Sequence, residues 1–143
     1  MNNLNEIHVA MVGSGGSGKT SILERLQGRV FTPIYRPNSE IRVYEVDIGE
    51  YRFIVSDYPG SRFYQESDFE SVTAYILVVD SPSRLSREYG RTLEAVMPDN
   101  IPSARMLNKS ELSTLPLTPE SCSAKNKTNL EAAFLSIAQQ IYG

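Results

Sequence analysis

The sequence has few of the residues that build disulfides and metal centres. Among its 143 residues there is one cysteine, Cys122, and one histidine, His8. A single thiol cannot form an internal disulfide, which favours a reducing compartment such as the cytoplasm. Without a second histidine or a pair of cysteines, the sequence argues against a zinc site. We therefore expect His8 to have a structural or surface role.

Long apolar runs and clustered positive charge are also missing. No run approaches the ~20 apolar residues of a membrane span, and the first residues lack the basic start and apolar core of a signal peptide. The formal net charge of -3 argues against a surface for nucleic acid or anionic membrane. The length predicts one domain, residues 1–143, with a buried core, and we expect a monomer.

Strand-like and helix-like stretches alternate, a pattern that predicts an α/β domain with a mainly parallel sheet. Gly49 and Glu50 separate two strand-like runs and predict a hairpin. Thr128 and Glu131 predict a capping box for the last helix, with a buried stripe of Leu130, Phe134, Ile137 and Ile141. The strand-like runs are residues 7–12, 41–48, 51–56, 74–79 and 103–107, and the other helix-like stretches are residues 20–28 and 85–96.

The stretch GSGGSGKT, residues 13–20, matches the phosphate-loop pattern G-x-x-x-x-G-K-S/T between a strand-like run and a helix-like one. Glycines let backbone N–H groups approach anionic oxygens, and a helix N-terminus adds partial positive charge. We expect Lys19 to contact the β- and γ-phosphates as a catalytic group and Thr20 to bind Mg²⁺. A turn without a ligand is the alternative. The predicted nucleotide-binding residues here are Gly13, Ser14, Gly15, Gly16, Ser17, Gly18, Lys19, Thr20 and Ser21.

Two further segments carry a resemblance to a known family. NKSE, residues 108–111, follows the last strand-like run, and SAK, residues 123–125, precedes the last helix-like stretch. With the phosphate loop, they make nearly the whole chain resemble the Ras-like small GTPases, such as Ras and Rab proteins, which carry Asn-Lys-x-Asp and Ser-Ala-Lys there. The resemblance implies a molecular switch in signal transduction or vesicle trafficking that binds GTP and GDP with Mg²⁺.

The resemblance also implies how the base is read. Asn108 is expected to support the base edge and the phosphate loop, Lys109 to pack over base and ribose, and the Ala124 N–H to meet the guanine oxygen. Glu111 stands where the family has Asp, and its extra methylene requires the paired hydrogen bonds to guanine to be rebuilt. Guanine is favoured, with ATP or another base as the alternative. The expected set is Asn108, Lys109, Glu111, Ser123, Ala124 and Lys125.

The segments that sense the γ-phosphate differ from the family. DYPG, residues 57–60, supplies its Asp-x-x-Gly motif, so Asp57 is expected to bind Mg²⁺ through water and Gly60 to lie at the nucleotide. Ser61 stands at the position of the Gln that orients the attacking water, and its side chain is too short to reach that water.

YRPNSE, residues 35–40, aligns with the family's Tyr-Asp-Pro-Thr-Ile-Glu, so Asn38 takes the place of the metal-binding Thr. A slip of one residue puts Ser39 there, and both remain open as Mg²⁺ ligands. With Ser39 as ligand, Arg36 has a spacing that resembles the built-in arginine of heterotrimeric G-protein α subunits. Arg36 is then a catalytic arginine, and otherwise a surface arginine near a partner-binding loop.

The resemblance implies a three-layer P-loop fold with a mostly parallel six-stranded sheet and one antiparallel edge strand from the hairpin. Only residues 112–122 separate NKSE from SAK, and they include Pro116 and Pro119. We therefore expect the helix before SAK to be shortened or missing.

Three functions are compatible with these motifs. The first is a slow GTPase whose hydrolysis a partner completes; the second is a GTP-binding interaction module without hydrolysis, motivated by Ser61 and Asn38; the third is a phosphate-loop protein for another base, motivated by Glu111. The resemblance implies GTPase-activating, nucleotide-exchange and effector proteins as partners of the switch loops. The C-terminal QQIYG is no prenylation box and Asn2 excludes N-myristoylation, so we expect no lipid anchor in this chain and recruitment to membranes only by partners.

Overall fold

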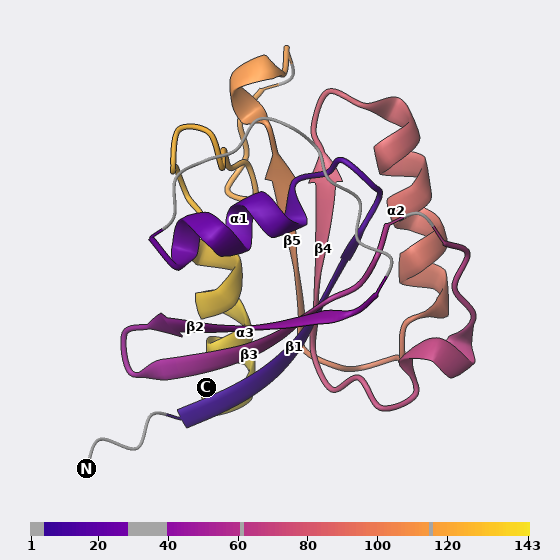
Figure 1. Cartoon of the computed structure of the whole chain (residues 1–143), viewed down its shortest axis with the longest axis vertical. Coiled ribbons are helices and arrows are strands. Elements are labelled where there is room, and N and C mark those ends of the chain that lie inside the picture. The colour runs from indigo at the N-terminus through magenta and orange to yellow at the C-terminus, as the bar shows by residue number, and fades with distance from the viewer. Residues whose placement is uncertain (1–4, 29–39, 61, 115) are drawn as a thin grey trace.

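The structure is a computed structural model that describes residues 5–28, 40–60, 62–114 and 116–143. Its elements follow the alternation of strand-like and helix-like stretches in the sequence (Figure 1). The strands are β1 (Asn5–Gly13), β2 (Arg42–Ile48), β3 (Tyr51–Asp57), β4 (Tyr75–Asp80) and β5 (Ser103–Asn108). The helices are α1 (Lys19–Leu26), α2 (Arg84–Val96) and α3 (Ala132–Tyr142), with the 3₁₀ turns η1 (Glu66–Phe69) and η2 (Ser110–Leu112).

The strands form one sheet in the order β2-β3-β1-β4-β5 (Figure 1). All neighbours pair in parallel except β2 and β3, which form the predicted antiparallel hairpin at the edge. The described sheet has five strands rather than the expected six. In the sixth place, a one-residue parallel bridge joins Leu107 to Ser121. The short connection of residues 112–122 must both leave the sheet and return, which leaves little length for a strand.

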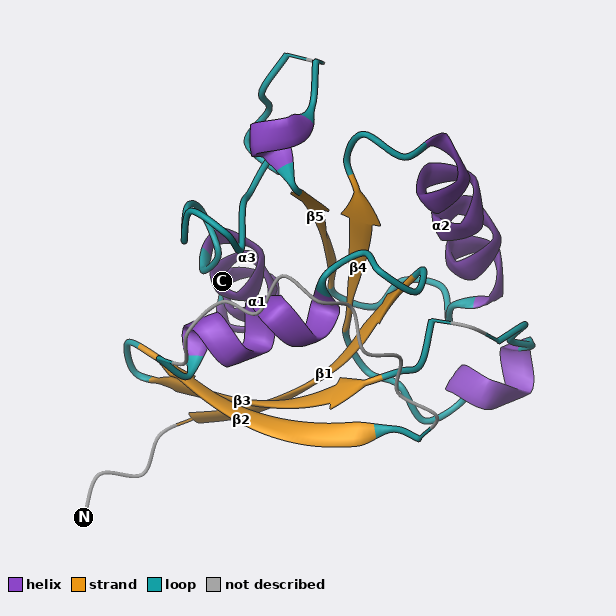
Figure 2. Ribbon diagram, turned by 45° about the horizontal axis from the view of Figure 1, so that its top comes forward, coloured by secondary structure: helices purple, strands orange, loops and turns teal. Residues whose placement is uncertain are grey.

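Helices cover both faces of the sheet, as the predicted three-layer fold requires (Figure 2). On one face, α1 and α3 pack on the sheet, and the rings of Phe53 and Phe134 meet edge to face at 5.2 Å. On the other face, Leu93 of α2 and Phe69 of η1 pack against Val12. Successive side chains of a strand point to opposite faces, so the part of a strand that is covered on both sides is apolar, as residues 76–79 of β4 are.

The C-terminal ends of α1 and α2 agree with the sequence prediction, whereas the start of α3 does not. Gly28, with φ +83, follows α1, and Pro98 follows α2. The predicted capping box of Thr128 and Glu131 is wrong. α3 begins at Ala132 with no side-chain cap, because Thr128 instead exchanges backbone hydrogen bonds with Ser123.

The buried stripe of α3 is confirmed for three of its four residues. Leu130, Phe134 and Ile137 are buried, whereas Ile141 in the last turn is 43% exposed. No helix lies between η2 and Ser123 in the described residues there, as Pro116 and Pro119 predict. None of the described helices is long and apolar enough to cross a membrane.

Candidate nucleotide-binding site

The candidate site lies where the parallel strands end. Strands β1, β3, β4 and β5 finish with Gly13, Asp57, Asp80 and Asn108, respectively, and these carboxyl ends share one edge of the sheet. After β1 the chain enters α1 on one face, and after β4 it enters α2 on the other face. Ligands of open α/β sheets bind in the crevice created by such a divergence.

The phosphate loop leads from β1 into the first turn of α1. Gly16 and Gly18 have φ of +79 and +98, a left-handed conformation that glycine adopts without steric cost. A Cβ at Gly18 would lie 2.2 Å from Asn108 Nδ2. Glycine at this position therefore serves both the loop conformation and the close approach of Asn108.

Lys19 points back into the loop. Its Nζ donates hydrogen bonds to the carbonyl oxygens of Gly13, at 3.0 Å, and Ser14, at 3.1 Å. Burial lowers the pKa of Lys19 from 10.5 to about 8, and the negative charge of Asp57 partly opposes this shift. A phosphate in the loop would supply the counter-charge that the buried ammonium group lacks.

Thr20 and Asp57 lie together beside the loop. Thr20 Oγ1 donates to Oδ2 of the buried Asp57 at 2.8 Å. A hydroxyl and a carboxylate suit Mg²⁺, which usually takes few protein ligands together with substrate phosphates. No group of three or more His, Cys, Asp or Glu that could hold a metal by itself occurs in the described part of the chain. The expected residues Asn38, Ser39 and Arg36 lie outside the described residues.

The turn from Asp57 to Gly60 rests on the phosphate loop. Gly15 N donates to Gly60 O at 3.1 Å. A Cβ at Gly60 would lie 2.3 Å from Gly15 N and 2.4 Å from the carbonyl carbon of Ser14. The hydroxyl of Tyr64 also donates to the carbonyl of Pro59, so the turn is held at two points. Ser61 lies outside the described residues.

Asn108 joins the phosphate loop to the SAK segment. Its side chain is buried, with Nδ2 donating to Ser17 O at 2.9 Å and Oδ1 accepting from Ala124 N at 3.0 Å. The link to the loop agrees with the role expected of Asn108. The Ala124 N–H already has a partner here, so a guanine oxygen would share this donor or displace Asn108.

Glu111 is held by the SAK segment. Ser123 Oγ donates to Glu111 Oε1 at 2.6 Å and accepts from Asn126 N at 3.0 Å. The contact leaves Glu111 Oε2 as the oxygen available to a base edge. Lys125, the last residue of SAK, is exposed. The structure thus brings Glu111 and SAK together, although they belong to segments on either side of the shortened connection.

Asp80 and Ser86 are part of this arrangement and were missed by sequence reasoning. Asp80 Oδ2 accepts from Lys109 Nζ at 2.9 Å, and Lys109 Nζ also donates to Gly16 O at 2.6 Å. The hydroxyls of Ser86 and Ser14 are 2.7 Å apart. A polar residue at the end of a buried parallel strand was a usable signal for Asp80. Ser86 gave none, because its contact partner is 72 residues away.

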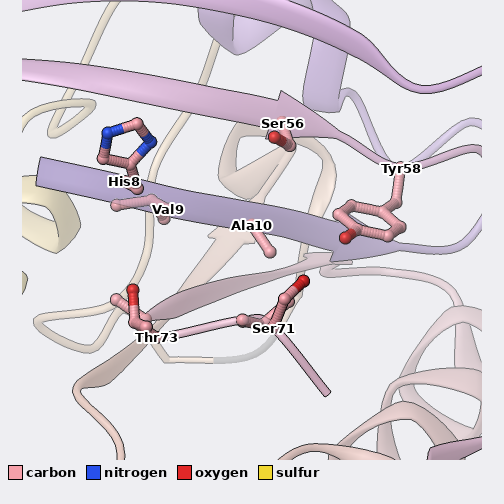
Figure 3. Close-up of a pocket in the computed structure, with 9 residues that line it drawn as sticks. His8, Val9, Ala10, Ser56, Tyr58, Ser71 and Thr73 are labelled. Atoms are coloured by element: carbon pink, nitrogen blue, oxygen red, sulfur yellow. The ribbon is translucent and has the colours of Figure 1, made fainter. Parts of the chain in front are cut away.

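A cavity of about 150 Å³ lies apart from this site. Figure 3 shows its lining: His8 and Ala10 of β1 face a space bordered by Ser56, Tyr58, Ser71 and Thr73. None of the predicted nucleotide-binding residues lines it. The cavity is therefore separate from the nucleotide site.

The reactivity of Cys122 can test how tightly the protein packs around the NKSE and SAK segments. Its thiol is 1% exposed, and burial, with a smaller contribution from Glu111, raises the pKa of Cys122 from 9.0 to about 12. We expect a thiol reagent at pH 8 to modify it about 100-fold or more slowly in the folded protein than in denaturant. Because the folded protein favours the neutral thiol, Cys122 contributes to the free energy of unfolding. This contribution is fully present below pH 9 and is lost as the pH rises through 12. The absorbance change of a disulfide reagent measures the rate, and equal rates with and without urea would contradict this packing.

Comparison with protein families agrees with this geometry. Residues 1–100 match the family described as Arf: ADP-ribosylation factor family. A comparison with curated proteins found no match. The match includes the phosphate loop and the turn from Asp57 to Gly60, whereas NKSE and SAK lie beyond it. It confirms a GTP-binding small GTPase of the Ras superfamily, but not the narrower resemblance to Ras and Rab proteins. The chain belongs to the ADP-ribosylation factor family of small GTPases.

Proposed function

We propose that the protein binds GTP with Mg²⁺, hydrolyses it slowly to GDP and acts as a molecular switch. The observation that carries this proposal is the convergence of three predicted phosphate and metal ligands. Lys19 lies inside the phosphate loop, and next to it Thr20 Oγ1 is 2.8 Å from Asp57 Oδ2. A cation at the loop and paired oxygen ligands beside it fit a triphosphate with its metal.

In this proposal, different residues bind the phosphates, the metal ion and the base. Lys19 and the N–H groups of the loop hold the phosphates, and Thr20 and Asp57 hold Mg²⁺. When bound, the ion neutralises charge that develops on the phosphate oxygens. Asn108 and Glu111 orient the base, since one fixes the loop and SAK together and the other offers a carboxylate. Burial of Asp57 and Asn108 keeps these groups in place.

Slow hydrolysis follows from Ser61, which stands where relatives use Gln to orient the attacking water. Even enzymes with that Gln turn over at only about 10⁻⁴ s⁻¹ unaided. A regulator protein would therefore complete the reaction. Phe63, just after the turn, is 99% exposed, and an exposed aromatic ring there supports contact with such a partner.

The nucleotide that copurifies with the protein tests the proposal. We would denature protein prepared without added nucleotide and identify the released compound by ion exchange. GDP is the expected result, followed by single-turnover phosphate release from added GTP and Mg²⁺ at no more than about 10⁻⁴ s⁻¹. Phosphate release by the variant Lys19→Ala, prepared in the same way, measures the contribution of contaminating hydrolases. The proposal would be contradicted if no guanine nucleotide copurified and if direct titration showed no binding of added GDP or GTP.

A GTP-binding interaction module without hydrolysis is the second candidate. Ser61 favours it, because a serine side chain cannot hold the water that the missing Gln would orient. In that case the protein releases GTP on denaturation, and GTP stays intact through many hours of incubation. If the unaltered protein released phosphate no faster than Lys19→Ala, the result would favour an interaction module that binds GTP without hydrolysing it.

Glu111 is expected to give the site its preference for guanine. Changing Glu111 to Gln keeps the size and removes the charge, so affinity for GDP should fall by about tenfold or more, with little change for ADP. Competition of each nucleotide against a fluorescent guanine nucleotide measures both. The matched control is Glu94→Gln, which breaks a pair with Arg105 away from the site. Equal losses for GDP and ADP would show that Glu111 does not read the base.

A further inference from the structure

Two separate links connect Asp80 to the phosphate loop, and the first runs through its carboxylate. Asp80 Oδ2 accepts from Lys109 Nζ at 2.9 Å, and Lys109 Nζ donates to Gly16 O at 2.6 Å. The two side chains are 19% and 33% exposed, so water screens this pair less than a surface pair. Asp80 Oδ1 is buried and has no hydrogen-bond partner in the described residues. Lys109 is therefore the cation that compensates this carboxylate.

The second link runs through the main chain. Asp80 N donates to Ser86 Oγ at 2.9 Å, and Ser86 Oγ lies 2.7 Å from Ser14 Oγ. Ser86 is buried in the first turn of α2, where its N–H is capped by Ser83 Oγ at 3.2 Å. The hydroxyl of Ser86 is thus fixed by the helix and can hold Ser14 in turn.

We infer that Asp80 is a positioning residue for nucleotide binding, which holds Ser14 through Ser86 and Gly16 through Lys109. The two held residues flank Gly15, which is the exposed part of the loop. Fixing the loop on both sides keeps its N–H groups aimed at one point, so that less ordering is needed when phosphates bind. Asp80 acts through these neighbours without touching the nucleotide. The inference rests on the proposed function, since it concerns the same site.

The test is the rate at which a fluorescent guanine diphosphate leaves the protein in excess unlabelled GDP. Asp80→Asn keeps the shape and removes the charge that pairs with Lys109. We expect release to become about tenfold faster, which corresponds to about 1.4 kcal/mol. The matched control is Asp47→Asn, which breaks an aspartate–arginine pair of 3.0 Å with Arg52 in the β2–β3 hairpin. Its release rate should equal that of the unaltered protein.

A double variant separates positioning from a general structural effect. If Asp80 acts through Lys109, then Asp80→Asn combined with Lys109→Met should release nucleotide no faster than Lys109→Met alone. Effects that multiply in the double variant would overturn the inference. So would an unchanged release rate in Asp80→Asn, provided that the unaltered protein binds guanine nucleotide. Failure of the unaltered protein to bind it would overturn the proposed function together with the inference.

Ser86→Ala covers the case in which Asp80→Asn does not fold. It removes only the second link and leaves the charges in place, so we expect release to be about threefold faster. The circular dichroism spectrum should stay that of the unaltered protein. A release rate equal to that of the unaltered protein would overturn the link through Ser86 and, with it, the two-sided support of the loop.

Discussion

Replacing Lys19 by methionine is expected to lower the affinity for guanine nucleotides by about 100-fold or more. The ammonium group lies within the phosphate loop, 3.0 Å from Gly13 O and 3.1 Å from Ser14 O. Charged hydrogen bonds contribute about 1.5–3 kcal/mol each, so loss of those to two phosphates accounts for the expected change. Titration with a fluorescent guanine diphosphate measures it.

The same change should leave the nucleotide-free fold intact. Burial lowers the pKa of Lys19 to about 8, which means that the folded state disfavours the charged form. This penalty is fully present below pH 8 and fades as the pH rises from 8 towards 10.5, the ordinary value. Methionine removes the penalty, so the midpoint of thermal unfolding at pH 7 should not fall by more than about 3 °C.

Lys127→Met is the matched control for this prediction. Lys127 is exposed and lies two residues beyond SAK. Its removal changes the net charge equally, so it tests whether a general electrostatic effect explains any loss of affinity. Equal losses for Lys19→Met and Lys127→Met would contradict a specific role of Lys19 in holding phosphate.

The sequence predicted those features that are coded within a few neighbouring residues. The phosphate loop is a contiguous match, and the hairpin turn at Gly49 and Glu50 is equally local. The support of the loop is different in kind. Asp80 reaches Lys109 across 29 residues, and Ser14 reaches Ser86 across 72. No periodicity or spacing encodes such pairs, because the sheet topology alone decides which strand ends meet.

The errors at the C-terminal end have the same origin. Thr128 has the residue type and spacing of a helix cap, but its backbone is paired with Ser123. This pairing forms the loop that presents SAK next to Asn108, and the Ala124 N–H bonds to Asn108 Oδ1 at 3.0 Å. A local preference for capping has therefore yielded to a tertiary arrangement that builds the site.

A methyl group added at Gly60 should destabilise the protein by about 2 kcal/mol. The Cβ of an alanine would lie 2.3 Å from Gly15 N, 2.4 Å from the Ser14 carbonyl carbon and 2.7 Å from Gly13 O. All three are backbone atoms of the phosphate loop, which cannot rotate away as a side chain can. The turn must therefore separate from the loop, which also breaks the 3.1 Å hydrogen bond from Gly15 N to Gly60 O.

The thermal unfolding midpoint of Gly60→Ala should accordingly fall by about 5 °C. Gly49→Ala is the matched control, because there an added Cβ strains the backbone conformation without a steric clash. Gly49 has φ +59, and a Cβ there meets no described atom within 4 Å, so its cost is the left-handed backbone alone, about 1–2 kcal/mol. Affinity for nucleotide should fall only in Gly60→Ala, since only that change displaces the loop. Normal affinity in both variants would mean that the turn does not rest on the phosphate loop in solution.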